Sequence, residues 1–93
     1  MLGYYEIEIH IPAALSLKEK RFVIQSLKDK VRNKFNISIA ELGGTDVWQR
    51  STVGMAMVSN DHNLIKNSFD KITRILDQDD RFEIIDRQIE FYN

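Results

Sequence analysis

The sequence predicts an α+β domain of the ferredoxin-like kind, in which a four-stranded antiparallel sheet carries two helices on one face. Four segments alternate apolar and polar residues with the period of a strand, and two others repeat apolar residues with the period of a helix. Their order is strand, helix, strand, strand, helix, strand. Short connections and right-handed crossovers favour a single sheet for this order. We expect residues 1–93 to form one domain.

The first strand is predicted over residues 4–11, where Tyr5, Ile7, Ile9 and Ile11 fall on one face. Pro12 ends it, because proline cannot donate a hydrogen bond to a sheet.

A long helix is predicted over residues 16–35. Ser16 and Glu19 have the spacing of a capping box, which satisfies amides at a helix start. Six apolar residues fall within one arc of this helix and should face the core. They are Leu17, Val23, Ile24, Leu27, Val31 and Phe35.

The second half contains the remaining strands and helix. We expect strands over residues 37–42 and 47–58, separated by a GGTD turn. Ser59, Asn60 and Asp61 offer caps for the second helix. Its apolar stripe is Leu64, Ile65, Phe69, Ile72, Ile75 and Leu76, and the last strand, residues 82–92, places Ile85, Ile89 and Phe91 on one face.

Composition excludes several classes of function. The chain has no cysteine, so disulfides, thiol catalysis and cysteine zinc sites are excluded. No apolar run reaches the ~20 residues that span a bilayer, and the first ten residues do not resemble a signal peptide. We therefore expect a cytoplasmic protein that does not enter a membrane.

One helix concentrates positive charge, although the net charge is −1. Residues 16–35 hold seven Lys and Arg residues against two acidic ones. Four of the cations form a row on one side of the helix, which we call the basic row: Lys18, Arg21, Lys28 and Arg32. Such a row is typical of phosphate contact, and we expect it to bind nucleic acid without reading its sequence. The alternative is an ordinary solvated helix face.

Two other surfaces could bind partners. Tyr4 on the outer face of the sheet could stack an RNA base, but Glu6 and Glu8 share that face and would repel phosphate. Phe22 lies outside the apolar arc, and the strand over residues 47–58 is apolar on both faces. Either feature could belong to the interface of a homodimer or higher oligomer.

Catalysis is not expected. His10 and His62 are the only histidines, and Asn60-Asp61-His62 is better explained by helix capping than by a metal site. The chain has no phosphate-binding glycine loop and no HExxH motif. We predict no catalytic residue, no metal and no cofactor.

The segment DVWQR holds Asp46, the only tryptophan, Trp48, and Arg50. Asp46 is expected to close the preceding turn. If the strand begins at residue 47, Trp48 and Arg50 share a face and can form a cation–π pair. The pair then either anchors a loop or a partner, or offers a stacking plate beside the basic helix.

Three short segments occur in one order and spacing: SLKEKR at residues 16–21, DVWQR at 46–50 and VSND at 58–61. Together they resemble the YlxP-like family of small bacterial proteins of unknown function, over essentially the whole chain. The resemblance implies a ferredoxin-like fold in a bacterial cytoplasm. Members are often encoded near genes for translation and ribosome maturation, which favours a link to RNA or the ribosome. Val47 departs from the commoner leucine, and Tyr5 is an additional aromatic residue.

We therefore expect a non-enzymatic module that contacts RNA or the ribosome through the basic row. The alternative is a self-associating protein-interaction module with no nucleic-acid role.

Overall fold

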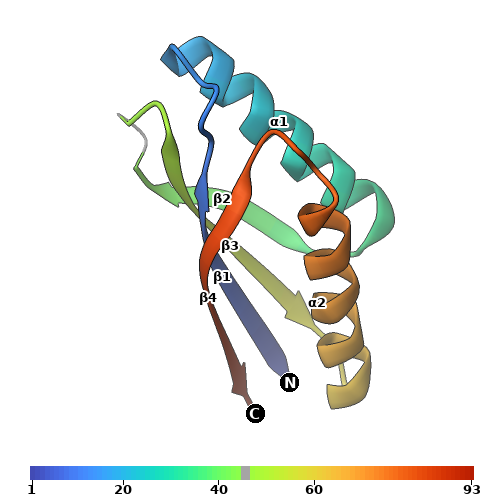
Figure 1. Ribbon diagram of the computed structural model, residues 1–93. Coiled ribbons are helices and arrows are strands. Elements are labelled where there is room, and N and C mark those ends of the chain that lie inside the picture. Colours follow the sequence, from blue (N-terminus) through green and yellow to red (C-terminus); the bar gives the residue numbers. More distant parts are fainter. Residues whose placement is uncertain (45–46) are drawn as a thin grey trace.

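The computed structural model, which describes residues 1–44 and 47–93, has the predicted order of elements. These are β1 (Leu2–His10), α1 (Leu17–Lys34), β2 (Ser38–Gly43), β3 (Arg50–Val58), α2 (His62–Asp77) and β4 (Glu83–Tyr92). The strands form one antiparallel sheet in the order β2-β3-β1-β4, and both helices cover the same face of it (Figure 1). The ferredoxin-like prediction is confirmed.

The core lies between the sheet and the helices. Tyr5, Ile7 and Ile9 of β1 are fully buried, as their alternation predicted. From β3, Val53 and Met55 join them. Because β1 and β3 are the two central strands, their inner faces supply the floor of the core.

The first helix begins and packs as expected, with one addition. Ser16 Oγ accepts a hydrogen bond from the Glu19 amide at 3.1 Å, and the Glu19 carboxylate accepts one from the Leu15 amide at 2.5 Å. Val23, Ile24, Leu27 and Val31 are buried, while Leu17 and Phe35 lie at the border of the core. Lys20 is also buried, which was not predicted.

The second helix is capped by Asp61, whose carboxylate accepts from the amides of Asn63 and Leu64. The inner side of α2 is formed by Ile65, Phe69, Ile72 and Leu76. Leu64 was predicted to face the core but is half exposed, because it lies at the outer border of the stripe. No helix in residues 1–44 and 47–93 is both long and apolar enough to span a membrane.

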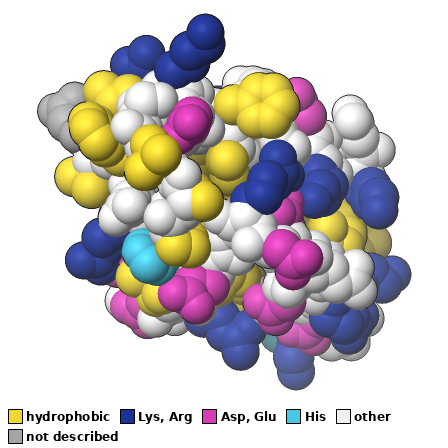
Figure 2. Space-filling model, turned by 45° about the horizontal axis from the view of Figure 1, so that its top comes forward, with side chains coloured by type: hydrophobic (Ala, Val, Ile, Leu, Met, Phe, Trp, Pro, Cys, Tyr) yellow, Lys and Arg dark blue, Asp and Glu magenta, His cyan; other side chains and the backbone are white. Residues whose placement is uncertain are grey.

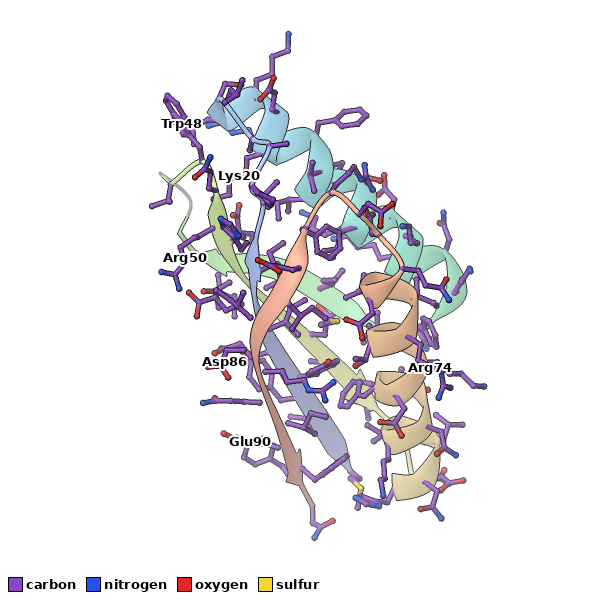
Figure 3. All side chains as sticks on the ribbon, in the orientation of Figure 1. Lys20, Trp48, Arg50, Arg74, Asp86 and Glu90 are labelled. Carbon is purple, nitrogen blue, oxygen red and sulfur yellow. The ribbon has the colours of Figure 1, made fainter. Side chains whose placement is uncertain are left out.

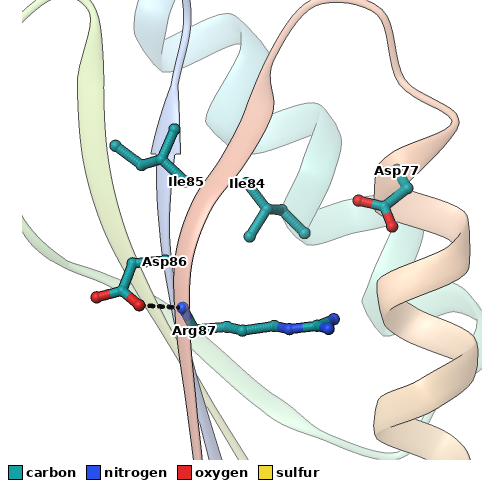
Figure 4. Close-up of a pocket in the computed structure, with 5 residues that line it drawn as sticks. All are labelled: Asp77, Ile84, Ile85, Asp86 and Arg87. Carbon is teal, nitrogen blue, oxygen red and sulfur yellow. Dashed lines mark hydrogen bonds between the residues drawn. The ribbon is translucent and has the colours of Figure 1, made fainter.

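The last strand corrects the prediction that Ile85 shares a face with Ile89 and Phe91. Ile9 of β1 is paired with Ile84, but the preceding residue of β1, Glu8, is paired with Asp86. Ile85 is thus an extra residue in a β-bulge, which shifts the alternation by one. Ile84 extends towards the helices, whereas Ile85 lies on the opposite side of the strand (Figure 4).

Candidate nucleic-acid interface

The basic row runs along the side of α1 that faces β2. The Arg32 guanidinium donates a hydrogen bond to the backbone carbonyl of Ile39 in β2 at 3.2 Å, which fixes this orientation. Lys18, Arg21 and Arg32 are exposed, and Lys28 is partly buried. The structure therefore places all four side chains on one side of the helix, above the β2 edge of the sheet.

Most of the row has no acidic partner. Within residues 1–44 and 47–93, no ion pair involves Lys18, Arg21 or Lys28. The other lysines of α1 differ: Lys20 and Lys30 are each paired with a carboxylate. The charge of the row is thus available to an external anion.

On the face of the molecule in Figure 2, the basic side chains do not form one continuous patch. In the space-filling view, Lys and Arg side chains lie at several separate places, with Asp and Glu side chains between some of them (Figure 2). Beside the row, Gln25 Nε2 donates to Asp29 Oδ1 at 2.8 Å and holds one carboxylate nearby.

Phe22, the predicted contact residue on α1, is 72% exposed. It is one of the most exposed large apolar side chains of the described residues. Isolated apolar side chains are common on protein surfaces, so Phe22 alone defines no interface.

The segment around DVWQR differs from the predicted strand start. β3 begins at Arg50, because the chain still turns at Val47, whose amide donates to the carbonyl of Gly44 at 3.0 Å. Trp48 lies in the bend before the strand and is about half exposed, and Asp46 lies outside the described residues.

The predicted pairing of Trp48 with Arg50 is wrong. Arg50 forms an ion pair with Glu8 of β1 on the outer face of the sheet. The Trp48 ring projects away from Arg50, at the end of the molecule (Figure 3). The two side chains therefore make neither a shared anchor nor a shared stacking plate.

Gln49, which the sequence did not single out, connects this segment to the rest of the fold. Its carbonyl accepts a hydrogen bond from the Ile11 amide at 2.8 Å. Its side-chain amide donates to the carbonyls of Pro12 and Ala14 at 3.1 and 3.4 Å. Gln49 thus joins the start of β3 to the connection between β1 and α1.

A second connection is formed by Lys20, Glu41 and Ser51. Lys20 Nζ lies 3.0 Å from Glu41 Oε2 and also donates to the carbonyl of Gly44. The Ser51 hydroxyl donates to the same Glu41 oxygen at 2.5 Å. Lys20 of the SLKEKR segment thus contacts residues on both sides of the DVWQR segment in the chain, namely Gly44 before it and, through Glu41, Ser51 after it. The Asp61 cap of VSND lies beyond the opposite end of β3.

An apolar hollow lies at the same end as DVWQR. Ala14, Leu15, Val47, Trp48 and Gln49 line it. Leu15 is 71% exposed and Trp48 51% exposed, so the hollow is shallow and open to solvent. Hydrophobic side chains gather beside the grey atoms in Figure 2.

On the outer face of the sheet, the tyrosine rings lie next to glutamate carboxylates. The Tyr4 hydroxyl donates to Glu6 at 2.6 Å, and this hydrogen bond, together with partial burial, raises the pKa of Tyr4 to about 12. Tyr92 bonds Glu90 in the same way, which raises its pKa as well. Each ring thus carries a carboxylate beside it, which disfavours the stacking of nucleotides there.

The histidines have structural neighbours. His10 Nδ1 lies 3.0 Å from Glu83 across the β1–β4 pair, and the His62 ring packs against Phe91 with centroids 4.3 Å apart. Among the described residues, no group of three His, Cys, Asp or Glu residues is placed to hold a metal ion.

The order of the elements and of the strands defines a small domain of the ferredoxin-like kind. Residues 2–89 match the family model described as "Protein of unknown function (DUF503)". The chain is 39% identical over 89 residues to the Bacillus subtilis protein named "Uncharacterized protein YlxP", which covers 96% of this chain and 94% of that one. The chain belongs to the DUF503 family, and the predicted YlxP-like resemblance is confirmed.

Two solved structures show the same architecture. A de novo designed protein, Foldit4, matches with a TM-score of 0.65 at 14% identity, and the structural-genomics protein YJCS with a TM-score of 0.61 at 12% identity. Each match covers 100% of both chains. At such low identity they support the fold alone.

Proposed function

We propose that this protein is a non-enzymatic module that binds RNA, free or within the ribosome, through the basic row of α1. The observation that carries the proposal is that the row has no acidic partner: none of its four cations is in an ion pair of the described residues, and all but the partly buried Lys28 are exposed. Cations held in this way on a rigid helix suit the regularly spaced phosphates of a nucleic-acid backbone.

The rest of the surface favours α1 over the sheet as the contact. Glu6, Glu8 and Glu90 lie on or beside the outer face, so a polyanion is repelled there. Arg50, which could offset this charge, is already paired with Glu8. An RNA strand is therefore best accommodated along α1, above the β2 edge.

Binding of this kind positions a protein without reading bases. The affinity should fall steeply with salt, by about 0.7 of a logarithmic unit per tenfold increase in salt for each contacted phosphate of a single strand. Four contacts give a slope of about −3 in a plot of log K against log salt.

The test compares RNA binding by charge-reversed variants. We expect Lys18→Glu with Arg21→Glu to weaken binding to a mixed-sequence RNA oligonucleotide and to ribosomal subunits, and to lower the salt slope. The matched control reverses two exposed lysines of the other helix, Lys66→Glu with Lys71→Glu, which changes the net charge equally. Fluorescence anisotropy and subunit pelleting measure the two ligands. Equal losses in both double variants, or no binding by the wild type at low salt, would contradict the proposal.

A second candidate function is self-association. The feature that favours it is the unpaired edge of β4, and not Phe22 or the central strand β3, whose two edges are already paired with β1 and β2.

A further inference from the structure

The outer edge of β4 is a long strand edge that no other strand of the sheet covers. β4 is the last strand of the sheet and runs over 10 residues, whereas β2 at the other edge has 6. It contains neither proline nor lysine, which commonly prevent edge strands from pairing. Its bulge is at Ile85, near the start, so residues 86–92 are regular. This segment is able to accept another strand.

The backbone groups of the free edge can be assigned from the hydrogen bonds of β1. The Ile11 amide donates to Gln49 of the β3 side, and Ser59 donates to the Met1 carbonyl. Odd-numbered residues of β1 therefore bond β3, and even-numbered ones bond β4. Since even residues of β1 are opposite even residues of β4, the odd residues of β4 direct their amides and carbonyls outwards. They are Arg87, Ile89 and Phe91. The Arg87 amide also donates to the Asp86 carboxylate at 2.8 Å, a bond that a pairing strand would replace, whereas among the described residues no such side-chain bond is formed by the amides of Ile89 and Phe91.

The side chains of these three residues are also incompletely covered. They lie on the helix side of the sheet, opposite Ile7, Tyr5 and Gly3 of β1. Phe91 contacts His62 and lies 6.4 Å from the Phe69 ring, both in α2. Even so, Ile89 is 43% exposed and Phe91 37% exposed. The helix thus leaves the apolar side chains of Ile89 and Phe91 partly exposed at the edge, where a neighbouring strand would cover them.

We propose that two copies of this chain pair through β4 as an antiparallel, two-fold symmetric dimer in which Ile89 of one copy is opposite Ile89 of the other. The symmetry makes the two surfaces identical, as in most homodimers. Only odd residues present outward amides, so odd residues must oppose one another. The helices of both copies then lie on the same side of one continuous sheet.

Charge selects this register. With Ile89 at the centre, Arg87 is opposite Phe91, Gln88 is opposite Glu90 and Asp86 is opposite Tyr92. The Arg87 side chain can then stack on the aromatic ring, and no like charges are opposite.

Each neighbouring register opposes like charges, which destabilises a strand pair. If the two-fold axis passed through Asp86, Arg87 or Glu90, that charged residue would be opposite the same residue of the other copy. A centre at Gln88 places Asp86 opposite Glu90, twice by symmetry.

The dimer is independent of the proposed RNA surface. The basic row lies above β2, at the other edge of the sheet, so pairing through β4 leaves it uncovered. The two interactions should respond to salt in opposite directions. RNA binding should weaken as the salt concentration rises. Dimerisation should strengthen, because salt screens the repulsion between the carboxylates of Asp86 and Glu90 that both copies bring near the interface.

In the first experiment, charges are introduced at residue 89, because residue 89 of one copy is opposite residue 89 of the other in the proposed dimer. We expect the wild type to dimerise reversibly between low micromolar and several hundred micromolar concentration in sedimentation velocity, without RNA. Ile89→Glu and Ile89→Lys should each weaken the dimer at least about tenfold, because like charges become opposite. An equimolar mixture of the two variants should restore a heterodimer.

The control is Ile85→Glu, which changes an isoleucine of similar exposure at the bulge and should leave the dimer intact. Thermal unfolding confirms that each variant is folded. A wild type that is monomeric at every concentration overturns the proposal. So does a dimer that persists in both charged variants, or a mixture that does not associate.

A second experiment uses the absence of cysteine from the chain. Opposing residues of a hydrogen-bonded antiparallel pair have Cα atoms about 5.5 Å apart, within the range of a disulfide. Mild oxidation should therefore cross-link Ile89→Cys into a covalent dimer faster than Ile85→Cys. Equal rates for the two variants would contradict the register.

Discussion

Lys20 of α1 and Glu41 of β2 form an ion pair, with Nζ 3.0 Å from Oε2, in which the lysine side chain is only 1% exposed. Lys20 also donates to the carbonyl of Gly44, and Ser51 donates to Glu41. The cluster therefore fastens the first turns of α1 to the end of β2 and the start of β3. One of the three segments that mark the family, SLKEKR, contributes Lys20 to this cluster.

Removing the buried cation should destabilise the fold. In Lys20→Met the Gly44 carbonyl loses the lysine donor and the Glu41 carboxylate loses its cation, keeping only the Ser51 hydroxyl, and we expect the free energy of unfolding to fall by about 2 kcal/mol or more. Urea denaturation measures it. The exposed Lys18→Met is the matched control and should stay within about 0.5 kcal/mol of the wild type. If the two variants were equally stable, the cluster would have no anchoring role.

Gln49 should matter more for stability than its conspicuous neighbour Trp48. Gln49→Ala removes two hydrogen bonds to the connection after β1 and should cost about 1 kcal/mol. Trp48→Ala removes a half-exposed ring and should cost less. Chemical denaturation of both variants compares them. The wild-type fluorescence should be red-shifted and readily quenched by iodide; blue-shifted emission would indicate that Trp48 is covered, for example by a partner.

Periodicity was sufficient to predict the elements and most of the core, because burial of one strand face or one helix stripe produces a regular pattern. Tyr5, Ile7 and Ile9 illustrate this in β1. Lys20 is the exception in α1. It lies at the centre of the apolar stripe of α1, and its position could have indicated burial, but its partner Glu41 is distant in sequence and could not be identified.

Local irregularities were not predictable from the pattern. The bulge at Ile85 places this isoleucine on the opposite face of the sheet from Ile89 and Phe91. Nothing in the residue types of β4 indicates where such a bulge occurs. The late start of β3 at Arg50 depends on the hydrogen bond between Val47 and Gly44 and on the anchoring of Gln49. Helical spacing alone predicted that the residues of the basic row share one side of α1. It could not predict that the row forms no ion pair among the described residues, because ion pairs depend on which distant residues the fold brings close.

Gly3 should not tolerate a side chain. A Cβ at Gly3 would clash with Ile65 Cγ2 and lie 3.0 Å from the Phe69 ring, two side chains of α2 that cover this part of β1. We expect Gly3→Ala to destabilise the protein by about 1–3 kcal/mol through overpacking. Gly43→Ala is the control, because its Cβ would meet Thr52 at an ordinary 3.5 Å. Thermal unfolding should separate the two variants, and similar melting temperatures would argue against close packing at Gly3.

Asp79 should make stability depend on acidic pH. Its carboxylate accepts from the Arg81 side chain at 2.6 and 2.9 Å and from Lys30 of α1 at 3.1 Å. The hydrogen bonds from Arg81, followed by the one from Lys30, hold the pKa of Asp79 well below its usual range, against the effect of burial. The interaction thus joins the end of α2 to α1 when the carboxyl group is ionised.

A depressed pKa stabilises the folded state above the pKa of the unfolded chain, about 4 for aspartate, and this contribution is lost as the pH falls further towards the folded value. Asp79→Asn should therefore reduce the free energy of unfolding by about 2 kcal/mol at pH 7. The difference from the wild type should shrink progressively below about pH 4. Urea denaturation across this range measures it, with the exposed Asp80→Asn as the control. A difference that stayed constant down to the most acidic pH at which the protein folds would show that the ionised carboxylate is not the source of the stability.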